Sequence, residues 1–314
     1  MAHKVETMAY AGQVPWHGLG KKVPADLTPR QMLKAAQLDW KVVKVPATIS
    51  NPVTMQEEET GHAALVRSSD GKQLDVVTDA WNPVQNQEAF DFFHEFVMAG
   101  DMEMHTAGSL KGGQIVWCLA KVKETFELFR GDQVENYLLF TNPHRFGHAL
   151  DVRMTPIRVV CWNTLTLSLS KHADKMITLN HRKKFDPEEA KKLLGIAHVK
   201  FADYREIAKF LGSKKYTQDT LVSYFNEVFP LTSNRGGKKE MSRHAQAAIE
   251  TVEKQPGANF AKGSWWQAFN AVTYMADHEL GQNDDSRLVS SWYGTNRGRK
   301  LEALTKAKEY ADAS

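Results

Sequence analysis

The chain has 314 residues, of which 42% are apolar and 25% charged, and a formal net charge of +3. That length allows one large domain or two ordinary ones with a real core, and the composition is usual for a globular protein. Without a run of 18 apolar residues or an apolar N-terminal core, the sequence predicts neither a transmembrane helix nor a signal peptide.

The first half of the chain predicts mainly β-strands joined by short turns. Residues 40–49 alternate and are rich in valine, and three later stretches each predict two strands around a turn, namely 62–78, 103–122 and 136–160. Residues 86–100 instead place apolar side chains at helical spacing and end at a glycine. Short turns favour antiparallel pairing. We therefore expect an α+β domain over residues 1–185, an antiparallel sheet with packed helices.

After about residue 185 the apolar spacing becomes helical. Residues 186–212 begin with an Asp cap and a proline in the first turn, which is typical of a helix start. Further amphipathic helices are expected within residues 218–229, 241–255, 264–280 and 298–313, with a Gly-Lys loop at 231–239. Residues 186–314 therefore predict a helical region, which could pack on the same core.

No motif for catalysis, cofactor binding or metal binding is present. The Gly-Lys loop does not fit a phosphate-binding loop, and none of the 12 histidines falls in a metal-ligand pattern. Of the two cysteines, Cys161 follows a predicted strand but lacks the glycines of a nucleophile turn, and Cys118 stands in an apolar run. Both are expected to be buried thiols, which suits a reducing cytoplasm. We expect no enzyme, no cofactor and no metal site.

Basic residues are unevenly distributed. Residues 1–150 hold 14 Lys and Arg against 18 Asp and Glu, whereas residues 171–215 hold 12 basic and 6 acidic residues. A basic segment suits a polyanionic partner, although a solvated helix face explains such a run equally well.

Cations and aromatic rings alternate around the predicted strand pair 136–160. Lys and Arg neutralise phosphates, while rings such as Phe146 and Trp162 can stack on unpaired bases. The candidate nucleic-acid-binding residues are Arg145, Arg153, Arg158, Asn163, Lys171, Lys175, Arg182, Lys183 and Lys184. The alternative is architectural: the two rings lie in the core, the arginines pair with Asp151 or with the acidic first half, and Asn163 only caps a helix.

Within this stretch, Pro156 is expected to end or kink a strand, and Asn163 and Thr164 to cap a helix over residues 164–171. If residues 149–158 form a strand, their odd separation places Arg153 and Arg158 on opposite faces. These two arginines would then not act together.

Four stretches carry a resemblance: VPWHGLGKKV at 14–23, AGSLKGGQIVW at 107–117, residues 137–169 with TPIRVVCWNTL, and SWWQAFNAVTYMADHE at 264–279. They are similar to a phage- and plasmid-associated family built on the domain of unknown function 932 (DUF932). The resemblance implies no established activity, but it implies a bacteriophage or plasmid protein in the bacterial cytoplasm. Such genomes commonly encode single-strand annealing proteins. Some of these, the Rad52-like ones, have a curved antiparallel sheet and assemble as rings around a basic groove, and the strand-rich first half followed by a basic segment resembles them in outline.

The expected function is sequence-independent binding of single-stranded DNA, with annealing as a further role, in phage or plasmid recombination or replication. The protein would act as a homo-oligomer. The alternative is a non-enzymatic protein-interaction module, such as a phage factor that modulates a host protein. Its contact surface would combine the acidic first half with Trp265, Trp266 and Trp292, because aromatic anchors are common at interfaces, although core packing explains most tryptophans equally well.

Overall fold

The computed structural model describes residues 5–12, 19–158, 177–179, 181, 185–188, 205–233, 237–282, 286–287, 290–291 and 294–314. The chain divides into two compact units. The first comprises Met1–Lys123, Tyr137–Met154 and Asp174–Gly195, and the second comprises Glu124–Asn136, Thr155–Ala173 and Ile196–Ser314. No helix among the described residues combines the length and the apolarity needed to cross a bilayer.

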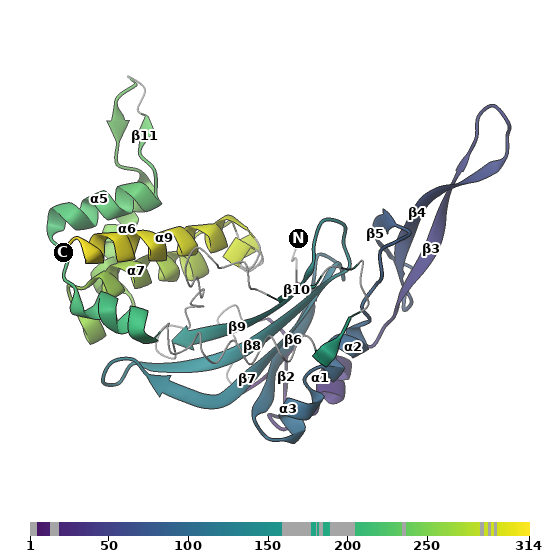
Figure 1. Ribbon diagram of the computed structural model, residues 1–314, viewed down its shortest axis with the longest axis horizontal. Coiled ribbons are helices and arrows are strands. Elements are labelled where there is room, and N and C mark those ends of the chain that lie inside the picture. The colour runs from purple at the N-terminus through teal and green to yellow at the C-terminus, as the bar shows by residue number, and fades with distance from the viewer. Residues whose placement is uncertain are drawn as a thin grey trace. The chain divides into compact units, whose positions relative to one another are not determined.

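The first unit is built on a seven-stranded sheet with the order β10-β9-β8-β7-β6-β1-β2 (Figure 1). Its strands are β1 Val5–Ala11, β2 Lys21–Val23, β6 Met102–Leu110, β7 Ile115–Glu127, β8 Gln133–Pro143, β9 Leu150–Arg158 and β10 Ile177–Leu179. β6 pairs antiparallel with β1 and β7, and β9 with β10, whereas β2 pairs parallel with β1. The prediction of an α+β fold with antiparallel sheets and C-terminal helices is confirmed.

Three short helices, α1 Pro29–Ala35, α2 Asn86–Asp91 and α3 His94–Met98, pack with the sheet around one apolar core. A reciprocal pair of hydrogen bonds determines where α1 begins, because Thr28 Oγ1 accepts from Gln31 N and Gln31 Oε1 accepts from Thr28 N. Alternate residues of the strands, such as Cys118 and Phe140, enter this core. Cys118 is therefore the buried thiol that its apolar run predicted.

A smaller antiparallel sheet has the order β3-β4-β5, formed by β3 Val42–Ser50, β4 Glu57–Arg67 and β5 Gln73–Thr78. One face of its base, with Val42, Leu65 and Val77, belongs to the core of the first unit. Beyond that base, β3 and β4 continue as a two-stranded projection (Figure 1). We call residues 48–60 the arm; its side chains are exposed except for Asn51 and Thr60, which are partly exposed.

Helices form most of the second unit. They are a helix over residues 205–213, α5 Gln218–Val228, α6 Arg243–Lys254, α7 Trp265–Tyr274 and α9 Thr295–Asp312, with a 3-10 turn at Ala258–Ala261 and a π-helical turn at Met275–Glu279. A two-stranded ribbon of β11 Thr232–Ser233 and β12 Lys239–Glu240 lies between α5 and α6. Side chains of Thr217, Ser242 and Ser264 cap α5, α6 and α7 by accepting backbone N–H groups.

The core of the second unit corrects one expectation. Trp265 and Trp266 are fully buried there, among Tyr224 and Phe225 of α5. They stabilise the helical core by burial, as large rings commonly do, and cannot serve as the surface anchors of an interaction module. Trp292 lies outside the described residues.

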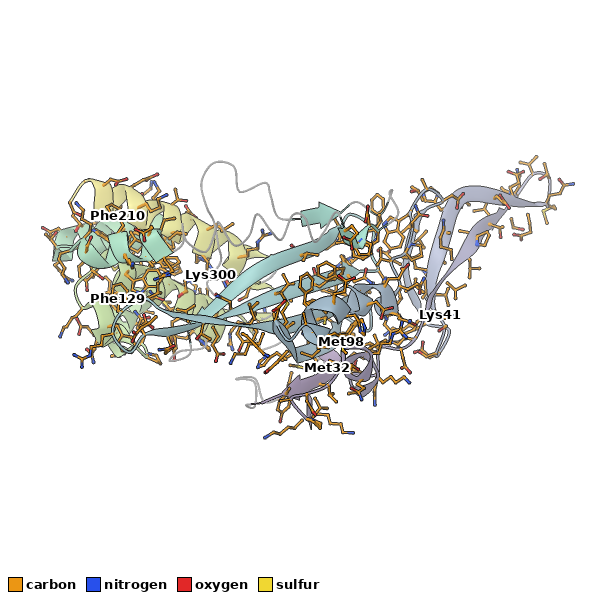
Figure 2. The ribbon with its side chains drawn as sticks, turned by 60° about the horizontal axis from the view of Figure 1, so that its bottom comes forward. Met32, Lys41, Met98, Phe129, Phe210 and Lys300 are labelled. Atoms are coloured by element: carbon orange, nitrogen blue, oxygen red, sulfur yellow. The ribbon has the colours of Figure 1, made fainter. Side chains whose placement is uncertain are left out.

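The tip of the β7–β8 hairpin also belongs to this second core. Leu128 and Val134 are buried in it, and the ring of Phe129 lies 6.3 Å from that of Trp266 (Figure 2). Gly212 makes room for Phe129, because a Cβ at position 212 would stand 2.3 Å from Phe129 Cζ. A long hairpin of the sheet therefore supplies apolar side chains to a helical core.

Pro156 is expected from the sequence to end or kink a strand; strand β9 does not end there but continues to Arg158. β9 pairs with β10 from Leu150 to Val152. Pro156 lies beyond this paired part, so its lack of an N–H group removes no hydrogen bond to β10. The helix expected over residues 164–171 lies outside the described residues, as do Cys161 and Trp162. The helix expected from residue 186 is described only at 187–188 and over 205–213.

Candidate nucleic-acid interface

The turn between β8 and β9 presents an aromatic ring and a cation side by side in sequence. Phe146 is 61% exposed, and Arg145 is partly exposed. The turn is held in place, because Phe146 N donates to Asp75 Oδ2 of β5 at 2.8 Å and His148 Nδ1 lies 3.2 Å from Phe146 O. The architectural alternative, which buried Phe146 in the core, is therefore wrong for this residue.

The two described arginines of the candidate site differ in their surroundings. Arg145 forms no ion pair or hydrogen bond with any of the residues that the structure describes. Arg153 instead pairs with Asp151, two residues earlier on the same face of β9, and only 14% of its side chain is exposed. Arg153 is thus neutralised as the architectural alternative expected, while Arg145 remains available to an anion.

The other candidate residues cannot be placed as side chains. Arg158 is the last residue of β9, and its side chain lies outside the described part of the chain. The same holds for Asn163, Lys171, Lys175, Arg182, Lys183 and Lys184. The structure therefore brings Arg145 and Phe146 together and sets Arg153 apart, and a continuous basic track stays a prediction.

Two buried histidines adjoin this turn. His144, the residue before Arg145, has its Nε2 atom 2.8 Å from Asn86 Oδ1, and its ring meets that of Trp40 edge-on at 5.5 Å. His181 stacks on Trp81 at 4.0 Å, with its Nδ1 atom 3.1 Å from Asn82 O.

Their tautomers follow from these acceptors. The amide nitrogen of Asn86 donates to Leu38 O, so its oxygen faces His144 and Nε2 carries the proton. His181 likewise donates from Nδ1 to a carbonyl oxygen. Burial lowers the pKa of His144 to about 3, with a further contribution from His181, and burial lowers the pKa of His181 to about 4. Both rings are therefore neutral near pH 7.

These buried groups hold the base of the turn in place. His144 N donates to Gln114 O at 2.8 Å, and Asn142 Nδ2 donates to Val84 O at the same distance. Two Asn-Pro dipeptides, at residues 82–83 and 142–143, thus lie at the meeting of three chain segments. In the part of the chain that the structure describes, no three His, Cys, Asp or Glu side chains gather in a way that could hold a metal ion.

A second polar cluster surrounds Arg67 on β4. Its guanidinium binds the carboxylates of Glu6 and Asp70 and lies 5.5 Å over the ring of Trp40. Hydrogen bonds from Arg67 lower the pKa of Asp70 to about 2, and those carboxylates raise the pKa of Arg67. The adjoining hollow of about 530 Å³ is lined by Glu6, Thr7, Gln37, Asp39, Trp40, Arg67, Ser68 and Ser69. Arg67, the cation that lines this hollow, is already paired with the carboxylates of Glu6 and Asp70, so the hollow does not suit a phosphate.

Sequence reasoning selected Arg145 and Phe146 as candidates but did not identify the residues that hold their turn in place. Asp75 lies 71 positions from Phe146 and carries no local signal of its role. The two Asn-Pro dipeptides are a signal that could have marked Asn82 and Asn142 as turn anchors.

A family model described as Domain of unknown function (DUF932) matches residues 73–304. This span runs from β5 into α9 and includes the β8–β9 turn. Comparison with curated proteins and with solved structures gave no match, so no solved structure supports a likeness to Rad52-like proteins. Because the matched span covers well over half of the chain, this protein belongs to the DUF932 family.

Proposed function

We propose that the protein binds single-stranded nucleic acid without sequence preference, and that the β8–β9 turn forms part of the contact. The observation that carries the proposal is the exposed ring of Phe146 on a fixed turn, next to Arg145. Stacking of a base on an aromatic side chain contributes about 1–3 kcal/mol and tolerates any base. The neighbouring guanidinium would neutralise a phosphate.

A single strand fits this surface better than a duplex. In a duplex the base faces are covered by their neighbours, whereas an unpaired base can leave the stack and cover an exposed ring. The basic residues that follow β9 and β10 in sequence, including Lys171, Lys175 and Arg182 to Lys184, would extend the contact along the backbone. Arg153 would contribute little, because Asp151 already neutralises it.

The biological setting of this proposal is phage or plasmid DNA recombination or replication in the bacterial cytoplasm, with annealing of single strands as a further role. It draws on the resemblance of the sequence to phage- and plasmid-associated proteins and on the basic segment 171–215. The substrate is then single-stranded DNA, and the acting species is a homo-oligomer.

Fluorescence anisotropy with a labelled, unstructured oligonucleotide tests the proposal at two salt concentrations. We expect binding at low salt that weakens steeply at high salt, because each phosphate contact releases counterions. Phe146→Ser should lower affinity about 5- to 150-fold, the equivalent of the stacking energy above. Arg145→Gln should lower affinity and reduce the salt dependence.

Met98→Ser is the matched control, since Met98 on α3 is another exposed apolar residue of the same unit (Figure 2). It should bind like the unmodified protein. Absence of binding at low salt would remove the proposed function. If Phe146→Ser and Arg145→Gln both bind with unchanged affinity, the β8–β9 turn has no part in it.

A further inference from the structure

Exposed apolar side chains are concentrated on the three-stranded sheet. Of the nine large apolar side chains exposed in the described part of the chain, six belong to it: Val43, Val45, Ile49, Val53, Met55 and Val76. The most exposed are at the end of the arm, where Val53 is 87% and Met55 81% exposed. A gathering of this kind is typical of a contact surface, whereas single exposed apolar residues need no explanation.

The end of the arm is an ordered turn that holds these two side chains outward. Asn51 Oδ1 accepts from Val53 N at 2.9 Å and from Thr54 N at 3.2 Å, and Met55 N donates to Asn51 O at 2.8 Å. Met55 adopts a φ of 57°, a conformation that glycine or asparagine would adopt more easily. A methionine in this position gives a flexible apolar contact at a conformational cost.

Charge accompanies the apolar tip. The arm contains Glu57, Glu58 and Glu59 and no Lys or Arg. We call residues 231–233 and 237–243, which include β11 and β12, the basic hairpin; they contain Lys238, Lys239 and Arg243 against a single acid, Glu240. Figure 1 shows its ribbon projecting from the helices of its own unit. The side chains of Lys239 and Arg243 are exposed.

The basic hairpin also carries the matching apolar residue. Leu231, at its start, is 43% exposed and is the only exposed large apolar side chain among the described residues of the second unit. The chain therefore carries two projecting elements with complementary chemistry. One combines Val53 and Met55 with three acids, and the other combines Leu231 with an excess of cations.

We propose that the arm of one copy docks on the basic hairpin of a second copy. Val53 and Met55 would cover Leu231, and the three glutamates would face Lys239 and Arg243. Because the two contacting surfaces differ, the contact is head-to-tail, and every copy can give an arm and receive one. The proposal involves other residues than the β8–β9 turn and does not depend on nucleic-acid binding.

Light scattering after size-exclusion chromatography, over a range of protein concentrations, tests this contact without nucleic acid. We expect a mass above that of the monomer that rises with concentration and falls at high salt, because exposed charge pairs are screened. Two charge-reversed variants should each become monomeric. One carries Glu57→Lys, Glu58→Lys and Glu59→Lys, and the other carries Lys238→Glu, Lys239→Glu and Arg243→Glu.

Mixing the two variants gives the decisive result. The basic arm of the arm variant is complementary in charge to the acidic hairpin of the hairpin variant. The unmodified acidic arm of the hairpin variant is likewise complementary to the unmodified basic hairpin of the arm variant. An equimolar mixture should therefore recover the mass of the unmodified protein. For the apolar part, Val53→Ser with Met55→Ser should abolish association, whereas the exposed control Met98→Ser should not.

Three outcomes would overturn the proposal. The unmodified protein could be monomeric at every concentration, or the mixture could remain monomeric. Alternatively, the hairpin variant could lose affinity for an oligonucleotide yet keep its oligomeric mass, which would make the hairpin a nucleic-acid contact instead. The substituted side chains are exposed, so circular dichroism should show an unchanged fold in each variant.

Discussion

Lys300 Nζ on α9 lies 2.7 Å from Asp277 Oδ1, and both side chains are buried, Lys300 completely. Asp277 belongs to the π-helical turn that follows α7. The ion pair therefore ties that turn to the C-terminal helix within the core of the second unit. Removing charges from water costs several kcal/mol for each ion, so this arrangement depends on the two partners remaining together.

Lys300→Ala should lower the free energy of unfolding by about 3–5 kcal/mol, because it removes a positive charge from beside a buried carboxylate. Replacing both partners, with Lys300→Met and Asp277→Leu, should cost less than the single change. Urea denaturation followed by circular dichroism measures both effects. Lys306→Ala is the control on the same helix and should cost far less, since its ion pairs with Glu227 and Glu309 are at the surface, where water and salt screen them. Equal losses for Lys300→Ala and Lys306→Ala would contradict this account.

Two glycines in helices should respond oppositely to the same substitution. Gly212→Ala should destabilise the protein by about 1–3 kcal/mol, because the new methyl group would overlap Phe129 and force the ring out of its place. Gly298 of α9 is exposed, and a methyl group added to it would meet no neighbouring atom within 4 Å. Gly298→Ala should stabilise by about 1 kcal/mol, the usual difference in helix propensity. Thermal unfolding of both variants checks the signs, and a stabilising Gly212→Ala would show that Phe129 does not pack there.

The elements that sequence could predict are those with local signals. Capping residues Thr217, Ser242 and Ser264 precede their helices, and glycines at 112 and 113 turn the chain between β6 and β7. Long-range packing carries no such signal. Nothing near Phe129 indicates that a hairpin tip enters a helical core, and Trp265 and Trp266 could equally well have been surface anchors until their neighbours were known.

The candidate site shows the same division. Composition and order in the chain were enough to select Arg145 and Phe146, since a cation and a ring in a predicted turn suit a nucleic acid. Composition could not separate Arg145 from Arg153. That difference depends on Asp151, which strand periodicity places on the face of Arg153. Composition also could not show that His144, the residue before Arg145, is completely buried.

The buried histidines should make the first unit sensitive to mild acid. In the unfolded chain both rings bind a proton near pH 6.5, whereas in the folded protein they do so only near pH 3 and 4. Their contribution to stability is therefore complete above pH 6.5 and is lost as the pH falls toward 4. Each histidine should remove on the order of 1.4 kcal/mol from the free energy of unfolding per pH unit in that window.

Urea midpoints measured between pH 7.5 and 4.5 check this dependence. His144→Gln with His181→Gln should flatten the decline, even if the variant is less stable at pH 7.5. His94→Gln, at an exposed position of α3, is the control and should retain the full decline. An unchanged slope in the double variant would show that other groups cause the acid sensitivity.

Arg67 should tolerate lysine far less well than Arg30 does, although both arginines bind a carboxylate through two nitrogen atoms. Arg67 is nearly buried and joins Glu6 of β1 to Asp70 beyond β4, whereas Arg30 is 63% exposed. A lysine keeps the charge but loses the planar fork and the contact with Trp40. Arg67→Lys should therefore lower the free energy of unfolding by about 1–3 kcal/mol, as for a hydrogen bond to a charged group, whereas Arg30→Lys should change it much less. Chemical denaturation of the two variants decides the matter, because similar losses would mean that the carboxylates of Glu6 and Asp70 need only a positive charge beside them.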